Sequence, residues 1–189
     1  VLYNITGTLM IADLYSAIQY VGKSTELYVA AFCLLFGFGA KAGMFPLHIW
    51  LPKAHPVAPA PASALLSGVL TKTGVFGILI VTGQILREDE IWGYTLLALA
   101  TITMVLGAVI AVFSNNLKRT LACSSLSQIG FILVGVSMIT LLGEENALAA
   151  NGTLLYMINH SIVKLVLFLC AGAIYLGAHT LDLNKLKGY

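Results

Sequence analysis

The chain has 189 residues, of which 59% are hydrophobic and only 10% are charged. Soluble domains carry about 25% charged residues, so this composition excludes an ordinary soluble fold and predicts an all-α, polytopic transmembrane helix bundle. The net charge of +2, without a basic run or interleaved aromatic residues, excludes a nucleic-acid partner and leaves the lipid bilayer as the expected surroundings.

Apolar stretches are long enough in five places for the ~20 residues of a transmembrane helix. They cover about 27–46, 60–83, 92–113, 121–142 and 147–177. Residues 1–26 are predicted to lie outside the cytoplasm, with an interfacial helix over 5–21. Residues 179–189 are predicted to form a cytoplasmic connection that is cut short. Because the chain opens on Val1 without an initiator Met and stops abruptly, we expect it to be a piece of a longer protein.

Charge alternates along the connections between the predicted spans. The basic ones are the loop at 52–59, the loop at 114–120 and the tail, and the acidic ones are the loop at 84–91 and the turn holding Glu144 and Glu145. The positive-inside rule therefore places the basic side in the cytoplasm, as in a bacterial inner (cytoplasmic) membrane. Lys118 and Arg119 precede the fourth span and are expected to be interfacial anchors.

Lys41, Lys72 and Lys164 lie within the hydrophobic stretches. A charged side chain at the bilayer centre costs roughly 2.5–3.5 kcal/mol, so sequences rarely carry three of them without a use. Burial disfavours a charged amine, and a buried lysine can therefore exchange protons near neutral pH. The three lysines predict a proton or ion path through the bundle.

Lys41 is surrounded by glycines, with Gly43 and Pro46 just beyond it. Glycine and proline weaken helix continuity, and such breaks survive in a membrane only where they face protein or a hydrated cavity. We therefore expect one discontinuous helix, broken at Gly43 and Pro46.

His160 and Lys164 are four residues apart, a spacing that stacks them on one helix face. Histidine titrates near neutral pH and can relay protons, so the pair extends the path predicted from Lys72. His48 and His55 flank Trp50, and two interpretations stay open: an aromatic and basic membrane-interface belt, or proton uptake from the cytoplasm.

The serines that begin the fourth span, among them Ser124 and Ser125, could hydrate a channel or join helices, and their pattern does not separate the two. The intramembrane set holds no carboxylate, so a counter-charge is expected on another helix or subunit. No catalytic residue, metal site or cofactor site is predicted in this chain.

Three long motifs carry a family resemblance. They are KAGMFPLHIWLPKAHPVAPAPASALLSGVLTKTG at 41–74, NNLKRTLACSSLSQIGFI at 115–132 and NHSIVKLVLFLCAGAIY at 159–175. The sequence resembles the antiporter-like subunits of respiratory complex I, membrane-bound hydrogenases including formate hydrogenlyase, and Mrp antiporters. The resemblance covers roughly 27–188 and implies the central part of an inverted-repeat fold.

The resemblance assigns roles to four residues. Lys41 matches the lysine of the broken helix, Lys72 the lysine that passes protons laterally, and His160 and Lys164 the central connecting residues. The family pairs the lysine at Lys41 with a glutamate on an earlier helix, which this sequence does not contain.

Three functions follow as expectations. The first is a proton-translocating subunit of a redox-driven complex, working with other membrane subunits and a peripheral arm of iron–sulfur, nickel–iron or flavin proteins. The alternative is a subunit of a Na⁺/H⁺ antiporter, and the third is a non-transporting scaffold. In none of these does the chain perform catalytic chemistry of its own.

Overall fold

The computed structural model describes residues 1–143 and 146–187, and every regular element within them is a helix. The order is α1 (Leu2–Thr6), α2 (Ile11–Val21), α3 (Thr25–Ala42), α4 (Trp50–Val57), α5 (Ala60–Leu65), the π-helix η1 (Leu66–Leu70), α6 (Thr71–Ile80), the π-helix η2 (Val81–Ile85), α7 (Glu90–Val112), α8 (Leu117–Leu141) and α9 (Asn146–Ala178). Glu144 and Glu145 lie outside the described residues, as do residues 188–189.

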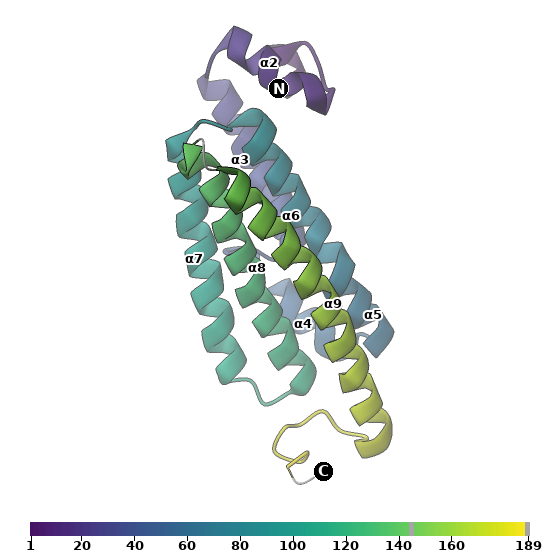
Figure 1. Cartoon of the computed structure of the whole chain (residues 1–189). Coiled ribbons are helices and arrows are strands. Elements are labelled where there is room, and N and C mark those ends of the chain that lie inside the picture. The colour runs from purple at the N-terminus through teal and green to yellow at the C-terminus, as the bar shows by residue number, and fades with distance from the viewer. Residues whose placement is uncertain (144–145, 188–189) are drawn as a thin grey trace.

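Five helical segments are long and apolar enough to cross a membrane: α3, the continuous segment Ala60–Ile85, α7, α8 and the Ala147–Ala178 part of α9. Helices suit this environment because they satisfy every backbone polar group within the segment. Figure 1 shows them side by side, with α9 running obliquely across the bundle. The predicted all-α transmembrane bundle is confirmed.

The first span is discontinuous, as the glycine and proline pattern predicts. Gly43 ends α3 in the left-handed conformation (φ 83°), and its N–H donates to the carbonyls of Gly39 and Ala40. Pro46 lies in the link that follows, before α4 begins at Trp50. The indole Nε1 of Trp50 donates to the Ala40 carbonyl at 2.8 Å, so the short second half is held against the end of the first.

The amino-terminal segment differs from its prediction. Residues 5–21 were expected to form one interfacial helix, but Gly7 ends α1 with φ 70° and α2 begins only at Ile11. Both short helices lie at the end of the bundle opposite α4 and the described carboxyl end (Figure 1).

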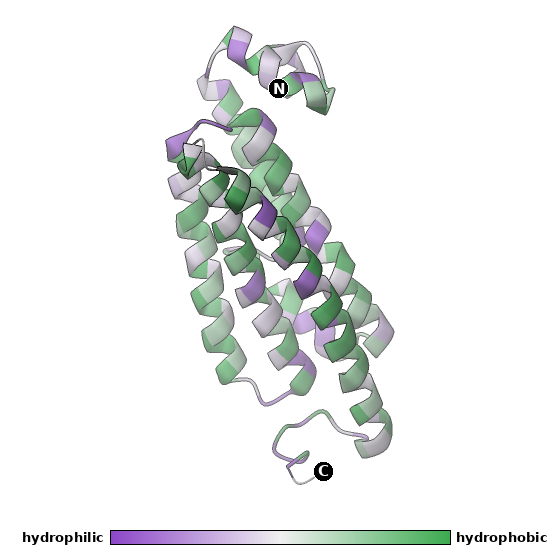
Figure 2. Ribbon diagram, viewed as in Figure 1, coloured by the Kyte–Doolittle hydropathy of each residue, from purple (hydrophilic) through white to green (hydrophobic). Residues whose placement is uncertain are grey.

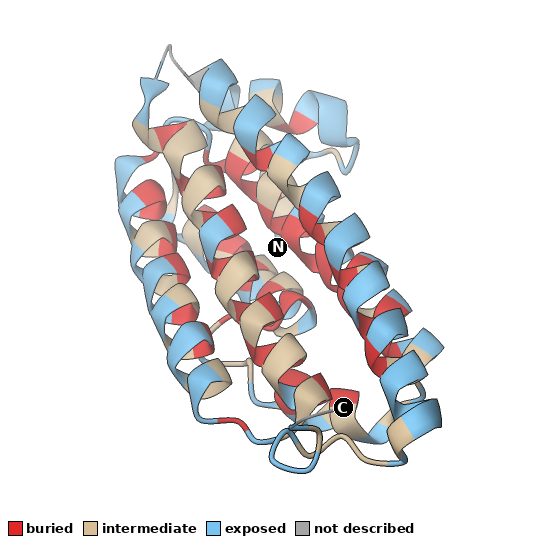
Figure 3. Cartoon of the chain, turned by 60° about the horizontal axis from the view of Figure 1, so that its bottom comes forward, coloured by how far each residue is buried: buried red, intermediate tan, exposed pale blue. Residues whose placement is uncertain are grey.

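The core lies between α3, α6, α7 and α8, where close approach depends on glycine. A Cβ on Gly74 would lie 2.6 Å from the Ala42 amide and the Phe38 carbonyl, so α6 rests directly on the backbone of α3. Gly130 likewise brings α8 onto α7, where a Cβ would lie 2.4 Å from the Met104 amide. Figure 3 shows buried residues on the inward faces of the helices and exposed ones on their outer faces.

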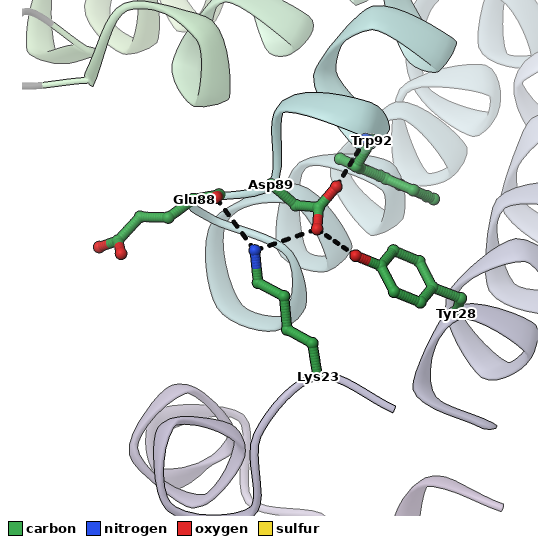
Figure 4. A network of polar contacts seen from close by, with 5 residues as sticks. All are labelled: Lys23, Tyr28, Glu88, Asp89 and Trp92. Carbon is green, nitrogen blue, oxygen red and sulfur yellow. Dashed lines mark hydrogen bonds and ion pairs between the residues drawn. The ribbon is translucent and has the colours of Figure 1, made fainter. Parts of the chain in front are cut away.

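A polar network closes the end of the bundle near the amino terminus (Figure 4). The Asp89 carboxylate begins α7 by accepting from the Trp92 N–H at 2.8 Å, and it also accepts from the Tyr28 hydroxyl and from the Lys23 ammonium at 3.0 Å. Burial would raise the pKa of the Asp89 carboxyl, but the bonds from Tyr28, Trp92 and Lys23 hold that pKa below its usual value.

Candidate functional site

Lys72 lies in the first turn of α6, near the middle of the span Ala60–Ile85, and is 7% exposed. Its ammonium donates to the backbone carbonyl of Ser67. The Thr71 hydroxyl donates to the same carbonyl at 3.1 Å. A backbone oxygen, rather than a carboxylate, therefore holds this buried cation.

The π-helix η1 explains why the Ser67 carbonyl is open to side chains. The Thr71 N–H donates to the Leu66 carbonyl, five residues back, whereas in an α-helix it would donate to Ser67. The Ser67 oxygen is thereby left for the Thr71 and Lys72 side chains. π-turns inside α-helices are often found at functional sites.

Lys164 lies on α9, is 4% exposed, and is also held by neutral groups. Its ammonium donates to the Leu121 carbonyl at 3.1 Å and to the Ser124 hydroxyl at 2.6 Å, both on α8. Two lysines far apart in sequence are thus brought to the same part of the interior.

A pair of serines joins the two lysine sites. The hydroxyls of Ser67 and Ser125 are 2.9 Å apart and fully buried. Ser125 also donates to the Leu121 carbonyl at 2.9 Å, the oxygen that Lys164 uses. Figure 2 shows single hydrophilic residues interrupting the otherwise hydrophobic helices of the bundle.

His160 lies one turn before Lys164 and is 4% exposed. Neither ring nitrogen has a hydrogen-bond partner among the described residues. The imidazole lies within electrostatic range of both Lys72 and Lys164, so the structure brings together three of the four residues predicted for proton translocation.

Lys41 stands apart from them. It is exposed on the bundle surface in the last turn of α3, and its ammonium makes no hydrogen bond or ion pair with any described residue. Its position beside the break at Gly43 suits a cation, because the carboxyl end of a helix attracts positive charge.

The two histidines of the 41–74 motif occupy different settings. His55 on α4 is fully buried and stacks on Phe168 with ring centroids 4.5 Å apart. The charges of Lys118 and Lys164 lie near the His55 ring. His48 is half-buried and packs against Phe45, with ring centroids 5.8 Å apart.

Lys118 corrects an expectation. It was predicted to be an interfacial anchor before the fourth span, but α8 begins at Leu117 and Lys118 is only 5% exposed. Its ammonium donates to the Ala58 carbonyl at 2.9 Å, in the link between α4 and α5. The sequence around Lys118 shows only charged residues at the start of a helix, and it does not indicate that the link between α4 and α5 covers Lys118.

The lysine sites have no acidic partner among residues 1–143 and 146–187. The ion pair found there is Lys23–Asp89, at the end of the bundle. The same residues hold no group of three histidine, cysteine, aspartate or glutamate side chains that could bind a metal. What the arrangement offers is a set of amines and an imidazole joined by hydroxyls and carbonyls.

The fold, with five apolar spans and two lysines buried among them, defines a polytopic membrane protein, and comparison with known proteins agrees. The whole chain, residues 1–189, matches the family described as NADH:quinone oxidoreductase/Mrp antiporter, transmembrane. The chain belongs to that family and is a multi-pass membrane protein.

Three relatives illustrate the match. Hydrogenase-4 component B of Escherichia coli (strain K12) is 41% identical over 96% of this chain and 28% of its own length. An Na(+)/H(+) antiporter subunit of Alkalihalophilus pseudofirmus is 38% identical over 99% of this chain and 37% of its own. A chain of the solved Mrp complex from Dietzia sp. DQ12-45-1b superposes with a TM-score of 0.83 at 31% identity, over 93% of this chain and 31% of that one. The chain thus spans about a third of its relatives' length.

Proposed function

We propose that this chain is the central part of a proton-translocating membrane subunit in which Lys72, His160 and Lys164 pass protons within the membrane. The observation that carries the proposal is the pair of buried lysines, Lys72 and Lys164, held by carbonyls and hydroxyls and linked through Ser67 and Ser125. Buried amines without a counter-ion are costly, and ionisable residues kept inside membranes commonly serve transport.

Lys41 is proposed as the outer member of the path. Its exposed ammonium is available to a carboxylate outside the described residues, on another part of the protein or on another subunit. Making or breaking that pair would change the local charge, and in a medium of low dielectric this change would act on Lys72. The proton would then move from Lys72 toward Lys164.

The driving reaction is proposed to be redox chemistry in a peripheral arm of iron–sulfur, nickel–iron or flavin subunits, with no cofactor in this chain. The likeness to hydrogenase-4 component B supports this reading. The likeness to an Na(+)/H(+) antiporter subunit and to a chain of the Mrp complex supports the second candidate, a cation/proton antiporter subunit. Sodium-driven proton movement without an electron donor would favour the second.

The proposed orientation places the end with α4, the α7–α8 link and the carboxyl-terminal tail in the cytoplasm. That end gathers the basic loops, which the positive-inside rule assigns to the cytoplasmic side, and a bacterial inner membrane is the corresponding location. On this orientation His48 and His55 lie toward the side of proton uptake. The fully buried ring of His55, stacked on Phe168, makes it the weaker proton carrier of these two histidines.

The test replaces Lys72 with Arg in the full-length subunit within its assembled complex. Arginine cannot release its proton in a protein, so a relay fails while a scaffold that needs only a cation survives. We expect proton translocation to be lost with assembly intact. Normal translocation with Lys72→Arg would instead support the scaffold function.

A further inference from the structure

The geometry points to Ser124 as a positioning residue, which makes Lys164 rather than Lys72 the lysine that holds the proton between transfers. The Ser67–Ser125 pair keeps the two lysine sites at a fixed distance from each other. This inference rests on the proposed proton-translocating function. It adds that neutral side chains decide which of the two lysines is protonated. In the sequence, Ser124 and Ser125 could not be distinguished from helix-joining residues.

The two ammonium groups differ in their acceptors. Lys72 donates to one oxygen, the Ser67 carbonyl, and shares it with the Thr71 hydroxyl. Lys164 donates to two, the Leu121 carbonyl and the Ser124 hydroxyl. The Leu121 carbonyl is shared as well, with the hydroxyls of Ser124 and Ser125, so the two sites differ by the Ser124 hydroxyl. Because hydrogen bonds to a charged group favour its charged form, the second acceptor gives Lys164 the advantage in holding the proton.

The surrounding charges do not supply that preference. The titratable groups that face Lys164 are Lys72 from α6, His55 from α4 and His160 on α9 itself. None of these is an acid, so none can serve as a counter-ion that stabilises the charged form of Lys164. With no carboxylate among the described neighbours to decide which lysine is charged, the number of hydroxyl and carbonyl acceptors decides it.

Ser125 connects the two sites mechanically. Its hydroxyl lies 2.9 Å from that of Ser67, whose carbonyl holds Lys72, and it donates to Leu121, whose carbonyl holds Lys164. The Ser67–Ser125 hydrogen bond therefore joins η1 to the first turns of α8, next to the two carbonyls that accept from the lysines. Loss of this hydrogen bond would let the two ammonium sites move apart.

The experiment measures the pH dependence of proton translocation by the full-length subunit in its assembled complex, reconstituted in vesicles. For Ser124→Ala we expect the alkaline fall in rate to occur about one pH unit lower, because a hydrogen bond to a charged group changes such an equilibrium roughly tenfold. Ser124→Thr keeps the hydroxyl and should restore the original profile. Ser125→Ala should lower the rate at every pH without moving the profile.

Ser137→Ala is the matched control. Ser137 lies on the same helix, is fully buried, and donates to the Val134 carbonyl of its own turn at 2.7 Å. A pH profile for Ser124→Ala identical to that of Ser137→Ala would overturn the inference. If Ser124→Ala does not assemble, Ser124→Cys provides the same comparison, because sulfur is a weak acceptor of nearly the same size.

Lys72→Ala, run in parallel, separates this inference from the function on which it rests. If Lys72→Ala translocates protons normally, the proposed function fails, and this inference with it. If Lys72→Ala is inactive while Ser124→Ala matches Ser137→Ala, the function stands and the role of Ser124 alone is overturned.

Discussion

Lys23 at one end of the bundle and Lys72 in its interior are both held by hydrogen bonds, but they differ in the charge of their acceptors. Lys23 pairs with the Asp89 carboxylate, and its side chain is 47% exposed. Lys72 is buried and donates to a backbone carbonyl, with no acid among its described neighbours. The first lysine has a carboxylate as its counter-charge, whereas the second has none among the described residues.

The two settings also differ in what they do for the fold. The Asp89 network fixes the start of α7 against α3 and the segment before it. The interior sites join η1, α8 and α9 through single hydroxyls and carbonyls. A paired lysine suits a structural role, and an unpaired one suits transport. We therefore expect substitutions in the Asp89 network to lower stability, and substitutions of the interior lysines to lower translocation.

Lys164→Ala should have the largest effect. We expect translocation by the assembled complex to fall roughly 100-fold, the typical contribution of a positioned proton-transfer group. Lys23→Ala is the matched lysine control and should leave translocation near the wild-type rate. Acidification of the vesicle lumen, followed with a pH-sensitive dye, measures both. Equal losses for the two variants would remove the distinction between paired and unpaired lysines.

Asp89→Ala should have the largest effect on stability. It removes the cap of α7 and leaves the Tyr28 hydroxyl without its acceptor, which together cost about 2–3 kcal/mol. Asp89→Asn keeps an oxygen for the Trp92 N–H and should lose about half as much. Thermal unfolding in detergent measures both changes. Wild-type stability of Asp89→Ala would show that the network is not structural.

The Asp89 network should also weaken in acid. Because the pKa of Asp89 is lower in the folded protein than the ordinary value of about 3.9, its contribution is present at neutral pH and is lost as pH falls below about 4. The stability difference between wild type and Asp89→Asn should therefore shrink as pH falls from about 4 to about 2. A constant difference across that range would contradict the assigned ionisation.

Gly74→Ala should displace Lys72 without changing any charge. The added Cβ would lie 2.6 Å from backbone atoms of α3, and such overpacking costs about 1–3 kcal/mol. Gly37→Ala is the matched control, because a Cβ at Gly37 meets nothing within 4 Å. Unfolding temperature and translocation rate should both fall for Gly74→Ala alone. No difference between the two variants would mean that α6 can shift freely.

Trp50→Phe should have the smallest effect. It removes the hydrogen bond to the Ala40 carbonyl across the helix break and keeps most of the ring's packing. Interhelical hydrogen bonds in membranes contribute about 0.6 kcal/mol on average. A stability loss well above 2 kcal/mol would show that the link between α3 and α4 depends on this bond far more than its geometry indicates.

The sequence predicted the helices and the break because both follow from local properties. Apolar length identifies a span, and Gly43 beside Pro46 identifies the end of α3. Spacing along one helix also placed His160 and Lys164 on the same face. The convergence of Lys72 with Lys164 could not be read in this way, since it depends on how α6, α8 and α9 pack.

The missed features have the same origin. Lys118 is buried by the link at Ala58, sixty residues earlier in the chain, and no local signal reports such a contact. The π-turn before Lys72 leaves the Ser67 carbonyl for the lysine, and the residue pattern of 66–70 did not indicate it. Ser124 and Ser125 acquire a role only through the lysines of other helices.

The most direct test of the central claim is proton translocation by the assembled complex with Lys72→Ala in the full-length subunit. We predict loss of translocation while assembly of the complex and the unfolding temperature of the subunit stay near their wild-type values. Unchanged translocation would contradict the claim, because Lys72 would then serve only the structure of the bundle, as Lys23 does at its end.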